Sequence, residues 1–404
     1  MKPITRPLRF KGPAPAMPEC WGHRGVRALQ VAKSIPLHTR VLNASSLFLL
    51  QASAAFPENT IASFDRAIRD GSEGLESDVH ITKDNVIVMF HDPSLERTTD
   101  GKGFIRDQNY HDGIEHVRTL KEPKQQIPTF RELCDLLMKE ENKHVKLNID
   151  VKPDNDPDRL FKLMKEVVSS YPNYQTDLSP RLILGLWHTV FLRAALEHVP
   201  ELARAHIGYS PWVARNFFWK DCQGFSMQFA ALVTADGQAF IKEANRAGKS
   251  VYVWTVNRKD EMIEATRWGV KAILTDDTAM LHHLRKEMTD NFPKTRSESV
   301  GLFFRWSTWR YYTVPQFVLQ SMWCSDVERR AGLSFKSGAS RIASVREAAA
   351  NGLLFSEKAL LVPADEAPLA APPAPPVVVD EKAPAPIIRP APAAASGSLL
   401  AVQA

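Results

Sequence analysis

The stretch ESDVHITKDNVIVMFHD, from Glu76 to Asp92, bears most directly on the fold. Its apolar residues alternate with polar ones, first at Val79 and Ile81 and then around Val88, as they do in β-strands. Carboxylates and histidines stand at the ends of these runs, although such groups are costly to bury without partners. We therefore expect the strand ends to form a functional site.

Strand-like and helix-like segments alternate along the chain. The strand-like runs are CWGHRG, GLESDVHI, VIVMFHD, VKLNIDVK, RLILGLW, ARAHIGY, GFSMQFA, SVYVWTVN and KAILTD. Helical spacing of apolar residues predicts helices over residues 60–70, 130–139, 157–169, 189–197, 237–247 and 259–268. Repeated strand–helix units predict a parallel sheet with helices outside it.

The polar residues collect at the carboxyl ends of the strand-like runs. A TIM (β/α)8 barrel builds its site at that face, and we expect this fold over residues 20–290. An open doubly wound sheet is the alternative, because it also binds ligands at the strand ends. One feature does not fit: there are nine runs for eight places. Only Thr82–Asn85 separates the second run from the third, which is too short for a helical crossover.

Composition narrows the class of protein. The 404 residues are 44% hydrophobic, which is enough for one large core or two ordinary ones. The net charge of +5, without a dense run of Lys and Arg, gives little support for nucleic-acid binding. The four cysteines show no CxxC pattern, so we expect reduced thiols in an intracellular protein rather than disulfides or a structural zinc site.

Both ends of the chain differ in composition from the middle. Residues 1–19 are basic and proline-rich and lack the apolar core of a secretory signal, so we expect a flexible N-terminus and no signal peptide. Residues 360–404 are rich in proline and alanine and are expected to be disordered.

Three carboxylates form a candidate metal site. Glu76 and Asp78 are two residues apart and share one face of a strand. Asp150 ends another strand and is expected to approach them. Such oxygen ligands suit Mg²⁺ or Ca²⁺. For an isolated Glu-x-Asp pair, a solvent-facing strand edge is the alternative.

Two histidines and two cations complete the candidate site. His23 and His91 can exchange protons near neutral pH. Arg24 and Lys152 can hold a phosphate, although structural salt bridges with the acids are their alternative role. Together with a metal, these groups predict metal-assisted cleavage of a phosphodiester.

Six motifs in order resemble the glycerophosphodiester phosphodiesterase family, across residues 20–285. They are GHRG, PENTIASFDRAI, ESDVHITKDNVIVMFHD, NIDVK, VYVWTVN and AILTDD. The resemblance implies a TIM barrel, in which His23 and His91 match the catalytic histidines and Arg24 matches the phosphate-contacting arginine. Glu76 and Asp78 match metal ligands.

The resemblance extends to further residues. Asp150 stands where the family more often has glutamate, and Lys152 matches the lysine of the same motif. Glu58, in the ENT motif, is expected as a further metal ligand. Trp254 and Asn257 would line the substrate pocket. Asp92 would support the site, and helix capping is the ordinary role for the Asn and Thr of ENT.

The mechanism implied by the resemblance has two steps. The glycerol hydroxyl next to the phosphoester attacks phosphorus, while one histidine removes its proton and the other protonates the leaving alcohol. Water then opens the cyclic glycerophosphate.

Some details are similar to the fungal phosphatidylglycerol phospholipase C branch of the family. These details are the aspartate in NIDVK, the run LILGLW at the next strand and an aromatic segment after the barrel. Phosphatidylglycerol would then yield diacylglycerol and glycerol phosphate. Water-soluble glycerophosphodiesters are the alternative substrates, and a weakly active lipid-binding barrel is the alternative function.

The aromatic segment is Val300–Ser325, with eight aromatic residues, two arginines and no acid. Its uncharged run is too short to cross a bilayer, but aromatics beside arginines suit a membrane interface. We therefore expect membrane association at the cytoplasmic face. A helix packed on the barrel is the alternative.

The segment Val26–Gln51 interrupts the family pattern, because its removal would leave GHRGASAAFPENTIASF. We hypothesise that it is a retained intron, since it adds a whole number of codons and its residues permit splice signals. An inserted loop over the site is the alternative.

Overall fold

The computed structural model describes residues 15–26 and 56–299, without the side chains of residues 297–299. The expectations for 300–325 and 360–404, and nearly all of the segment 26–51, lie outside the described residues. So do residues 1–14 of the expected flexible N-terminus. Glu19 already belongs to the first strand, so that expectation extended too far along the chain.

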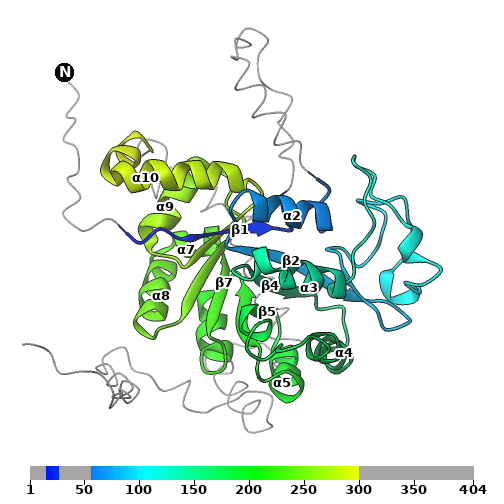
Figure 1. The fold of residues 1–404 in the computed structure, drawn as a ribbon. Helices are drawn as coiled ribbons and strands as arrows, with labels where there is room; N and C mark the ends of the chain where they lie inside the picture. Colours follow the sequence, from blue (N-terminus) through cyan, green and yellow to red (C-terminus); the bar gives the residue numbers. More distant parts are fainter. Residues whose placement is uncertain (1–14, 27–55, 300–404) are drawn as a thin grey trace, which may run out of the picture. The chain divides into compact units, whose positions relative to one another are not determined.

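Eight parallel strands form a closed barrel, because the first strand pairs with both the second and the last (Figure 1). This closure confirms the TIM barrel and excludes the open sheet. The strands are β1 (Glu19–His23), β2 (Gly74–Ile81), β4 (Lys146–Val151), β5 (Leu182–Leu186), β6 (Ala203–Gly208), β7 (Gly224–Gln228), β8 (Ser250–Trp254) and β9 (Ala272–Thr275).

The ninth strand-like run is explained by a hairpin. Strand β3 (Ile87–Met89) lies antiparallel to β2, with Val79 opposite Met89, and is not a barrel stave. An antiparallel neighbour needs only a tight turn, and Asn85 in that turn has a φ of 68°. The short connection that did not fit a crossover therefore fits this hairpin.

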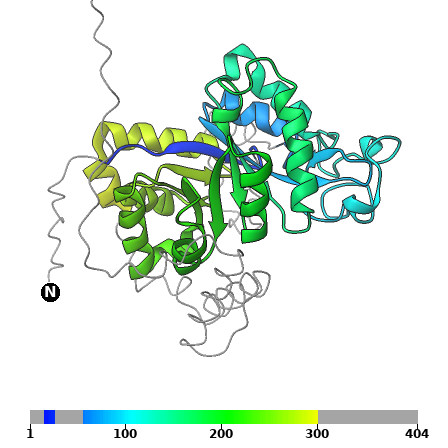
Figure 2. The same ribbon diagram turned by 90° about the horizontal axis from the view of Figure 1, so that it is seen from below.

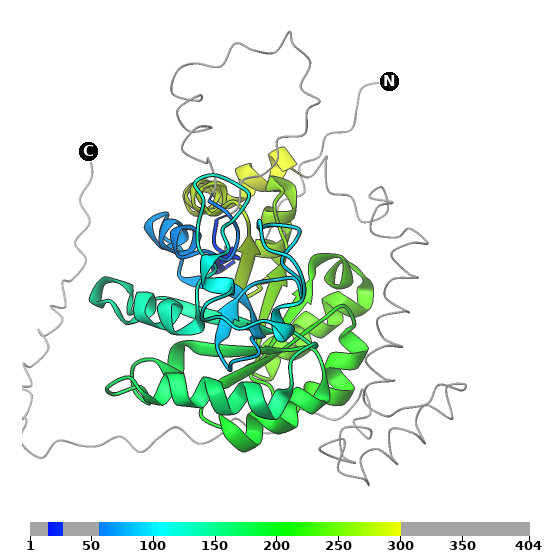
Figure 3. The same ribbon diagram turned by 90° about the vertical axis from the view of Figure 1, so that its right-hand side faces the viewer.

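The helices cover the outside of the barrel (Figures 1 and 3). For six of these helices the sequence predicted the first and last residues to within about two positions. The side chain of Thr60 caps the first helix by accepting from the N–H of Ser63. Short segments after β6 and β7, and the last helix, were not predicted. The helices are α2 (Ile61–Arg69), α3 (Phe130–Met138), α4 (Pro157–Ser169), α5 (Thr189–His198), α6 (Pro211–Val213), α7 (Phe229–Val233), α8 (Ala235–Arg246), α9 (Lys259–Trp268) and α10 (Thr278–Ser299), which kinks at Asn291.

The connection from β3 to α3 contains only short 3₁₀ turns, η2 (Ile105–Asp107) and η3 (Ile114–His116). It projects from one side of the barrel in two perpendicular views, coloured cyan (Figures 1 and 2). A separate small apolar cluster, which includes Leu95 and Tyr110, holds it together. This connection carries Arg97 to the carboxyl end of the barrel.

The amino-terminal half of the barrel interior is filled with side chains. Trp21 stacks on Tyr252 with ring centroids 4.6 Å apart, and Ile183 and Leu274 pack around them. The polar groups of the strands lie above this apolar plug, at the carboxyl ends. Any pocket at that end is therefore closed at its base.

Among the residues that the structure describes, no helix is both long enough and apolar enough to span a bilayer.

We predict that His206 makes the stability of the fold depend on pH. Its ring is buried, stacks on Phe218 and donates from Nδ1 to the carbonyl of Leu186 at 3.0 Å. Burial lowers the pKa of His206 from 6.5 to about 3, so below pH 6.5 the unfolded chain binds a proton that the native chain does not. Stability should therefore fall as the pH falls, by about 1.4 kcal/mol between pH 7.5 and 5.5 from this residue.

Urea unfolding of His206→Gln and of the parent at both pH values measures this contribution. The variant should lose less stability on acidification, whereas His144→Gln, at an exposed position, should behave as the parent. An unchanged pH dependence in His206→Gln would contradict the prediction.

Candidate active site

Three buried carboxylates meet at the carboxyl ends of β2 and β4. Glu76 and Asp78 point from one face of β2, and Asp150 lies beside Asp78 in the strand register. One oxygen of each lies within 4.8 Å of the others. The predicted cluster is confirmed, and the shorter Asp150 reaches it.

Crowding of these acids changes their protonation. Burial, together with repulsion from Asp78 and Asp150, raises the pKa of Glu76 to about 7. Burial also opposes ionisation of Asp78, but Lys152 and Arg24 outweigh it and hold the pKa of that carboxyl far below its usual range. Three ionised carboxylates at this spacing thus need more positive charge than the protein supplies.

The donor set fits a hard divalent cation. Carboxylate oxygens are the ligands that Mg²⁺ and Ca²⁺ prefer, and a cation would favour the ionised form of Glu76, which burial and the neighbouring carboxylates oppose. Glu76, Asp78 and Asp150 are the residues that could hold it.

Two cations neutralise part of this charge. The Nζ of Lys152 lies 2.6 Å from Asp78 Oδ1 and 2.7 Å from Asp150 Oδ2. The guanidinium of Arg24 lies 3.4 Å from Asp78 Oδ2 through Nε and 3.2 Å from Glu58 Oε1 through Nη1. Both predicted phosphate-binding residues are thus in place beside the carboxylates.

A tight turn after β1 brings Arg24 into the site. Arg24 and Gly25 have φ values of 55° and 82°, in the left-handed region. A Cβ on Gly25 would lie 2.3 Å from Ser63 Oγ, so only glycine fits there. The backbone N–H of Arg24 donates to Glu76 Oε2 at 3.0 Å, and its carbonyl accepts from the N–H of Asn59 at 3.0 Å.

The ENT motif supports the site in a way that sequence did not predict. Thr60 caps α2, as expected for that motif, but Asn59 donates from Nδ2 to Asp78 Oδ2 at 2.8 Å. Glu58 was expected to be a metal ligand and instead faces two arginines, with Oε1 2.7 Å from Nη2 of Arg97. It lies outside the carboxylate cluster because the guanidinium groups engage it.

His23 is held by an aspartate from the other end of the sequence. Its Nδ1 lies 2.8 Å from Oδ1 of Asp276, whose Oδ2 accepts from Asn257 Nδ2 at 2.7 Å. Asn257 was expected to line the pocket, but it lies behind His23 and fixes Asp276. Burial opposes protonation of His23, but Glu76 and Asp276 outweigh it and raise its pKa.

His91, which follows β3, is held by a carboxylate in the same way as His23. Its Nδ1 lies 2.6 Å from Asp92 Oδ1, which confirms Asp92 as support for the site. His80 donates from Nε2 to the carbonyl of His91 at 3.2 Å. Burial lowers the pKa of the His91 imidazole, and the nearby Asp78 offsets this only in part.

Arg97 joins the two sides of the site. Its Nη2 donates to Glu58, which in turn holds Arg24, and its Nε donates to Asp92, which holds His91. Sequence reasoning missed Arg97 because it lies in a connection without regular periodicity.

A cavity of about 150 Å³ opens among these groups. Trp187, which was also missed, donates from Nε1 to Asp150 Oδ1 at 2.6 Å. Trp254 lines the cavity as predicted and meets Tyr209 with ring centroids 5.3 Å apart. The lining consists of His23, Arg24, Glu76, His91, Asn148, Asp150, Lys152, Trp187, Ile207, Tyr209, Ser226, Trp254 and Leu274.

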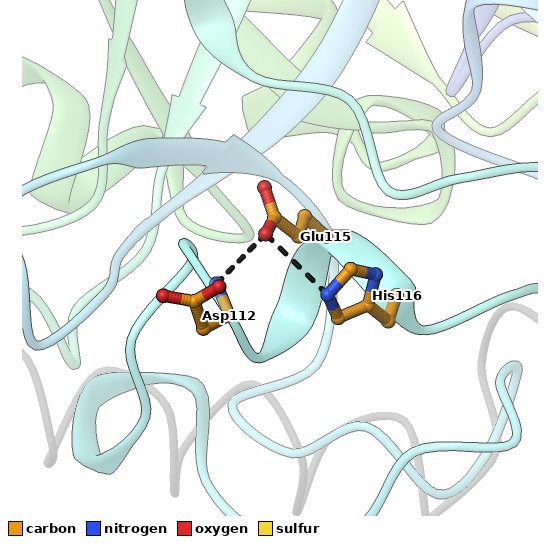
Figure 4. Close-up of side chains that lie close together, drawn as sticks. All are labelled: Asp112, Glu115 and His116. Carbon is orange, nitrogen blue, oxygen red and sulfur yellow. Dashed lines mark hydrogen bonds and ion pairs between the residues drawn. The ribbon is translucent and has the colours of Figure 1, made fainter.

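A second group of acids and a histidine in the described part of the chain is less suited to a metal. Asp112, Glu115 and His116 lie close together on the projecting connection (Figure 4). None of the three is buried, and Glu115 already accepts from the backbone N–H of Asp112 and lies 3.5 Å from His116 Nε2.

Comparison with known proteins agrees with the site. A family model described as the glycerophosphoryl diester phosphodiesterase family matches residues 52–280. The chain is 28% identical over 250 residues to a glycerophosphodiester phosphodiesterase of Caldanaerobacter subterraneus, covering 56% of this chain and 92% of that protein. It is 28% identical over 273 residues to glycerophosphodiester phosphodiesterase 1 of Mus musculus, and the match covers 58% of this chain and 76% of that protein.

Solved structures share the fold. A phosphodiesterase of Oleispira antarctica, in complex with the product sn-glycerol-3-phosphate, has a TM-score of 0.51 at 21% identity, covering 67% of this chain and 97% of that one. A glycerophosphoryl diester phosphodiesterase homologue of Silicibacter pomeroyi has a TM-score of 0.54 at 18% identity, and the match covers 68% of this chain and 95% of that one.

We predict that Asp276→Asn lowers kcat for phosphodiester cleavage by roughly 10²–10⁴-fold, because an amide cannot hold the His23 imidazole in the tautomer that a carboxylate favours. Steady-state kinetics measure the loss. Asp277→Asn is the matched control, because Asp277 accepts from the N–H of Met280 at the start of α10 and asparagine can replace it there. Equal activity of the two variants would contradict this role.

We also predict that Arg97→Gln lowers kcat by about 10–100-fold with a smaller change in KM, because Glu58 and Asp92 lose their common partner. The Arg97 side chain is 42% exposed, so its ion pairs should add little to stability. Arg97→Lys should not restore kcat, since an ammonium lacks the planar fork that reaches both acids. Arg106→Gln, in the same connection, is the control, and parent-like kcat in Arg97→Gln would refute the prediction.

Proposed function

This chain belongs to the glycerophosphoryl diester phosphodiesterase family and is a phosphoric diester hydrolase, and we propose that it cleaves water-soluble glycerophosphodiesters with a bound divalent metal ion. The products would be glycerol 3-phosphate and an alcohol. The observation that carries the proposal is one cavity lined by two histidines, two cations and the carboxylates Glu76 and Asp150.

The relatives support this substrate class. Those named above are glycerophosphodiester phosphodiesterases. The Oleispira antarctica enzyme was solved with sn-glycerol-3-phosphate as its product. The same compound is the product expected here.

The two histidines would move protons in both steps. Because carboxylates engage the Nδ1 atoms of both rings, proton exchange with the substrate would fall to Nε2 of His91 and to Nε2 of His23, which lies 3.4 Å from the Thr255 hydroxyl. One histidine accepts the proton of the glycerol hydroxyl as its oxygen bonds to phosphorus, and the other donates a proton to the departing alcohol. In the second step, water adds to phosphorus and the ring P–O bond of the cyclic phosphate breaks.

Charge on the phosphate would be offset by the cations around it. Arg24 and Lys152 lie at the cavity wall and can bind the phosphate oxygens. A divalent ion held by Glu76, Asp78 and Asp150 would supply further positive charge where charge develops in the transition state.

Phosphatidylglycerol is the second candidate substrate, because the composition of Val300–Ser325 suits a membrane interface. Its glycerol headgroup presents the same hydroxyl next to the same phosphoester, and its cleavage would release diacylglycerol. The chain would then act at the cytoplasmic face of a membrane.

The segment Val26–Gln51 remains a proposed retained intron. The range matched by the family model begins at residue 52, directly after it, which supports an insertion between the GHRG motif and the rest of the family pattern.

The function is tested with the full chain on glycerophosphocholine and on phosphatidylglycerol vesicles, with and without EDTA. We expect EDTA to abolish glycerol 3-phosphate release from the soluble diester, and Mg²⁺ or Ca²⁺ to restore it. His91→Ala should lower kcat by about 10²–10⁴-fold, whereas His144→Ala, at an exposed position, is the control.

Diacylglycerol release from the vesicles alone would favour the phospholipase function. Vesicle binding without turnover in any metal would contradict both proposals and favour a lipid-binding barrel.

A further inference from the structure

The carboxylate of Asp150 is engaged by protein donors on both of its oxygens. The indole N–H of Trp187 donates to Oδ1 at 2.6 Å, and the ammonium of Lys152 lies 2.7 Å from Oδ2. Asp150 and Lys152 are 6% and 9% exposed, so water competes little for these contacts. Each oxygen of a carboxylate has two lone-pair sites, and a hydrogen bond occupies one of them. Asp150 therefore has less to offer a metal ion than an unengaged carboxylate has.

The other two acids of the cluster are restricted in a similar way. The backbone N–H of Arg24 donates to Glu76 Oε2 at 3.0 Å. Nδ2 of Asn59 donates to Asp78 Oδ2 at 2.8 Å, and the Nζ of Lys152 lies 2.6 Å from Asp78 Oδ1. The cluster is therefore suited to offer an ion one oxygen from each acid, and one oxygen of each acid lies within 4.8 Å of the others.

The side chain of Trp187 is held in place by its surroundings. It follows β5 directly and is 7% exposed. Its ring centroid lies 5.8 Å from that of Tyr209 and 5.9 Å from that of Trp254. Gly185, two residues earlier, is the register neighbour of Asp150, so the end of β5 lies beside the acid. The packed indole thus keeps its N–H on Oδ1 of Asp150.

Mg²⁺ and Ca²⁺ make different demands on such a site. Ca²⁺ takes roughly six to eight oxygens in flexible geometry and commonly includes a carboxylate that binds through both of its oxygens. Mg²⁺ takes about six oxygens in a nearly ideal octahedron and keeps several of its waters, so it needs few carboxylate oxygens from the protein. Three acids that offer one oxygen each therefore suit Mg²⁺ better than Ca²⁺.

We propose that Trp187 is a positioning residue that sets the metal preference of the enzyme. By donating to Oδ1, it confines Asp150 to coordination through one oxygen and so favours Mg²⁺ over Ca²⁺. Coordination through both oxygens requires the carboxylate to turn its plane toward the ion, and the fixed donors on the two oxygens oppose that turn. This inference rests on the proposed function, because it names the ion that the carboxylate cluster would bind.

Calorimetric titration of the full chain with Mg²⁺ and, separately, with Ca²⁺ tests the inference in the parent and in Trp187→Phe. The phenyl ring retains an aromatic side chain at this position but cannot donate a hydrogen bond. The parent should bind Mg²⁺ at least as tightly as Ca²⁺. In Trp187→Phe the ratio of the two dissociation constants should shift toward Ca²⁺ by about tenfold, because the loss of a hydrogen bond to a charged group frees an oxygen for the larger ion.

Trp254→Phe is the matched control. The Trp254 side chain lines the same cavity, but its indole N–H has no hydrogen-bond partner among the described residues. Its removal should therefore leave the ratio of the two dissociation constants as in the parent. A misfolded fraction lowers the number of sites per chain rather than this ratio, so a general loss of structure does not imitate the predicted shift.

The outcomes separate this inference from the proposed function. A parent that binds Ca²⁺ more tightly than Mg²⁺ would overturn the role of Trp187 and leave the phosphodiesterase function standing. An unchanged ratio in Trp187→Phe, or an equal shift in Trp254→Phe, would do the same. A parent that binds neither ion would overturn this inference together with the metal dependence of the proposed function, whereas diester cleavage itself is read from glycerol 3-phosphate release.

Discussion

Repulsion among Glu76, Asp78 and Asp150 is the constraint on which the rest of the site depends. Their oxygens lie within 4.8 Å of one another in a buried place, where like charges are poorly screened. Lys152 lies between Asp78 and Asp150. The turn after β1 places the guanidinium of Arg24 beside Asp78 and Glu58. The protein supplies part of the compensating charge, and the arrangement leaves room for a cation to supply the rest.

Both histidines depend on carboxylates that come from different parts of the chain. Asp276 follows the last strand and holds His23, and Asp92 follows β3 and holds His91. Arg97 connects the His91 side to Glu58 and hence to the turn after β1. The barrel thus lets segments far apart in sequence act on one phosphate, because its strands all end at the same face.

Local patterns predicted most of the strands and helices, but they left an open sheet as an alternative to the barrel until the pairing of β1 with β2 and β9 decided between them. Strand β2 and helices α4 and α9 were predicted to the residue, because the residue patterns that indicate them are local in the sequence. The partner of His23 was not predicted, since Asp276 is 253 residues away in sequence. Glu58 and Asn257 were correctly placed at the site, but a motif does not show which neighbour a side chain meets.

The most direct test of the account is calorimetric titration of the full chain with Mg²⁺ and with Ca²⁺, beside the variant Glu76→Gln. The account predicts that the parent binds one divalent ion and that the variant binds it at least about tenfold more weakly, because one of three carboxylate ligands is lost. A parent that binds neither ion, or a variant that binds as tightly as the parent, would contradict the carboxylate cluster as the metal site.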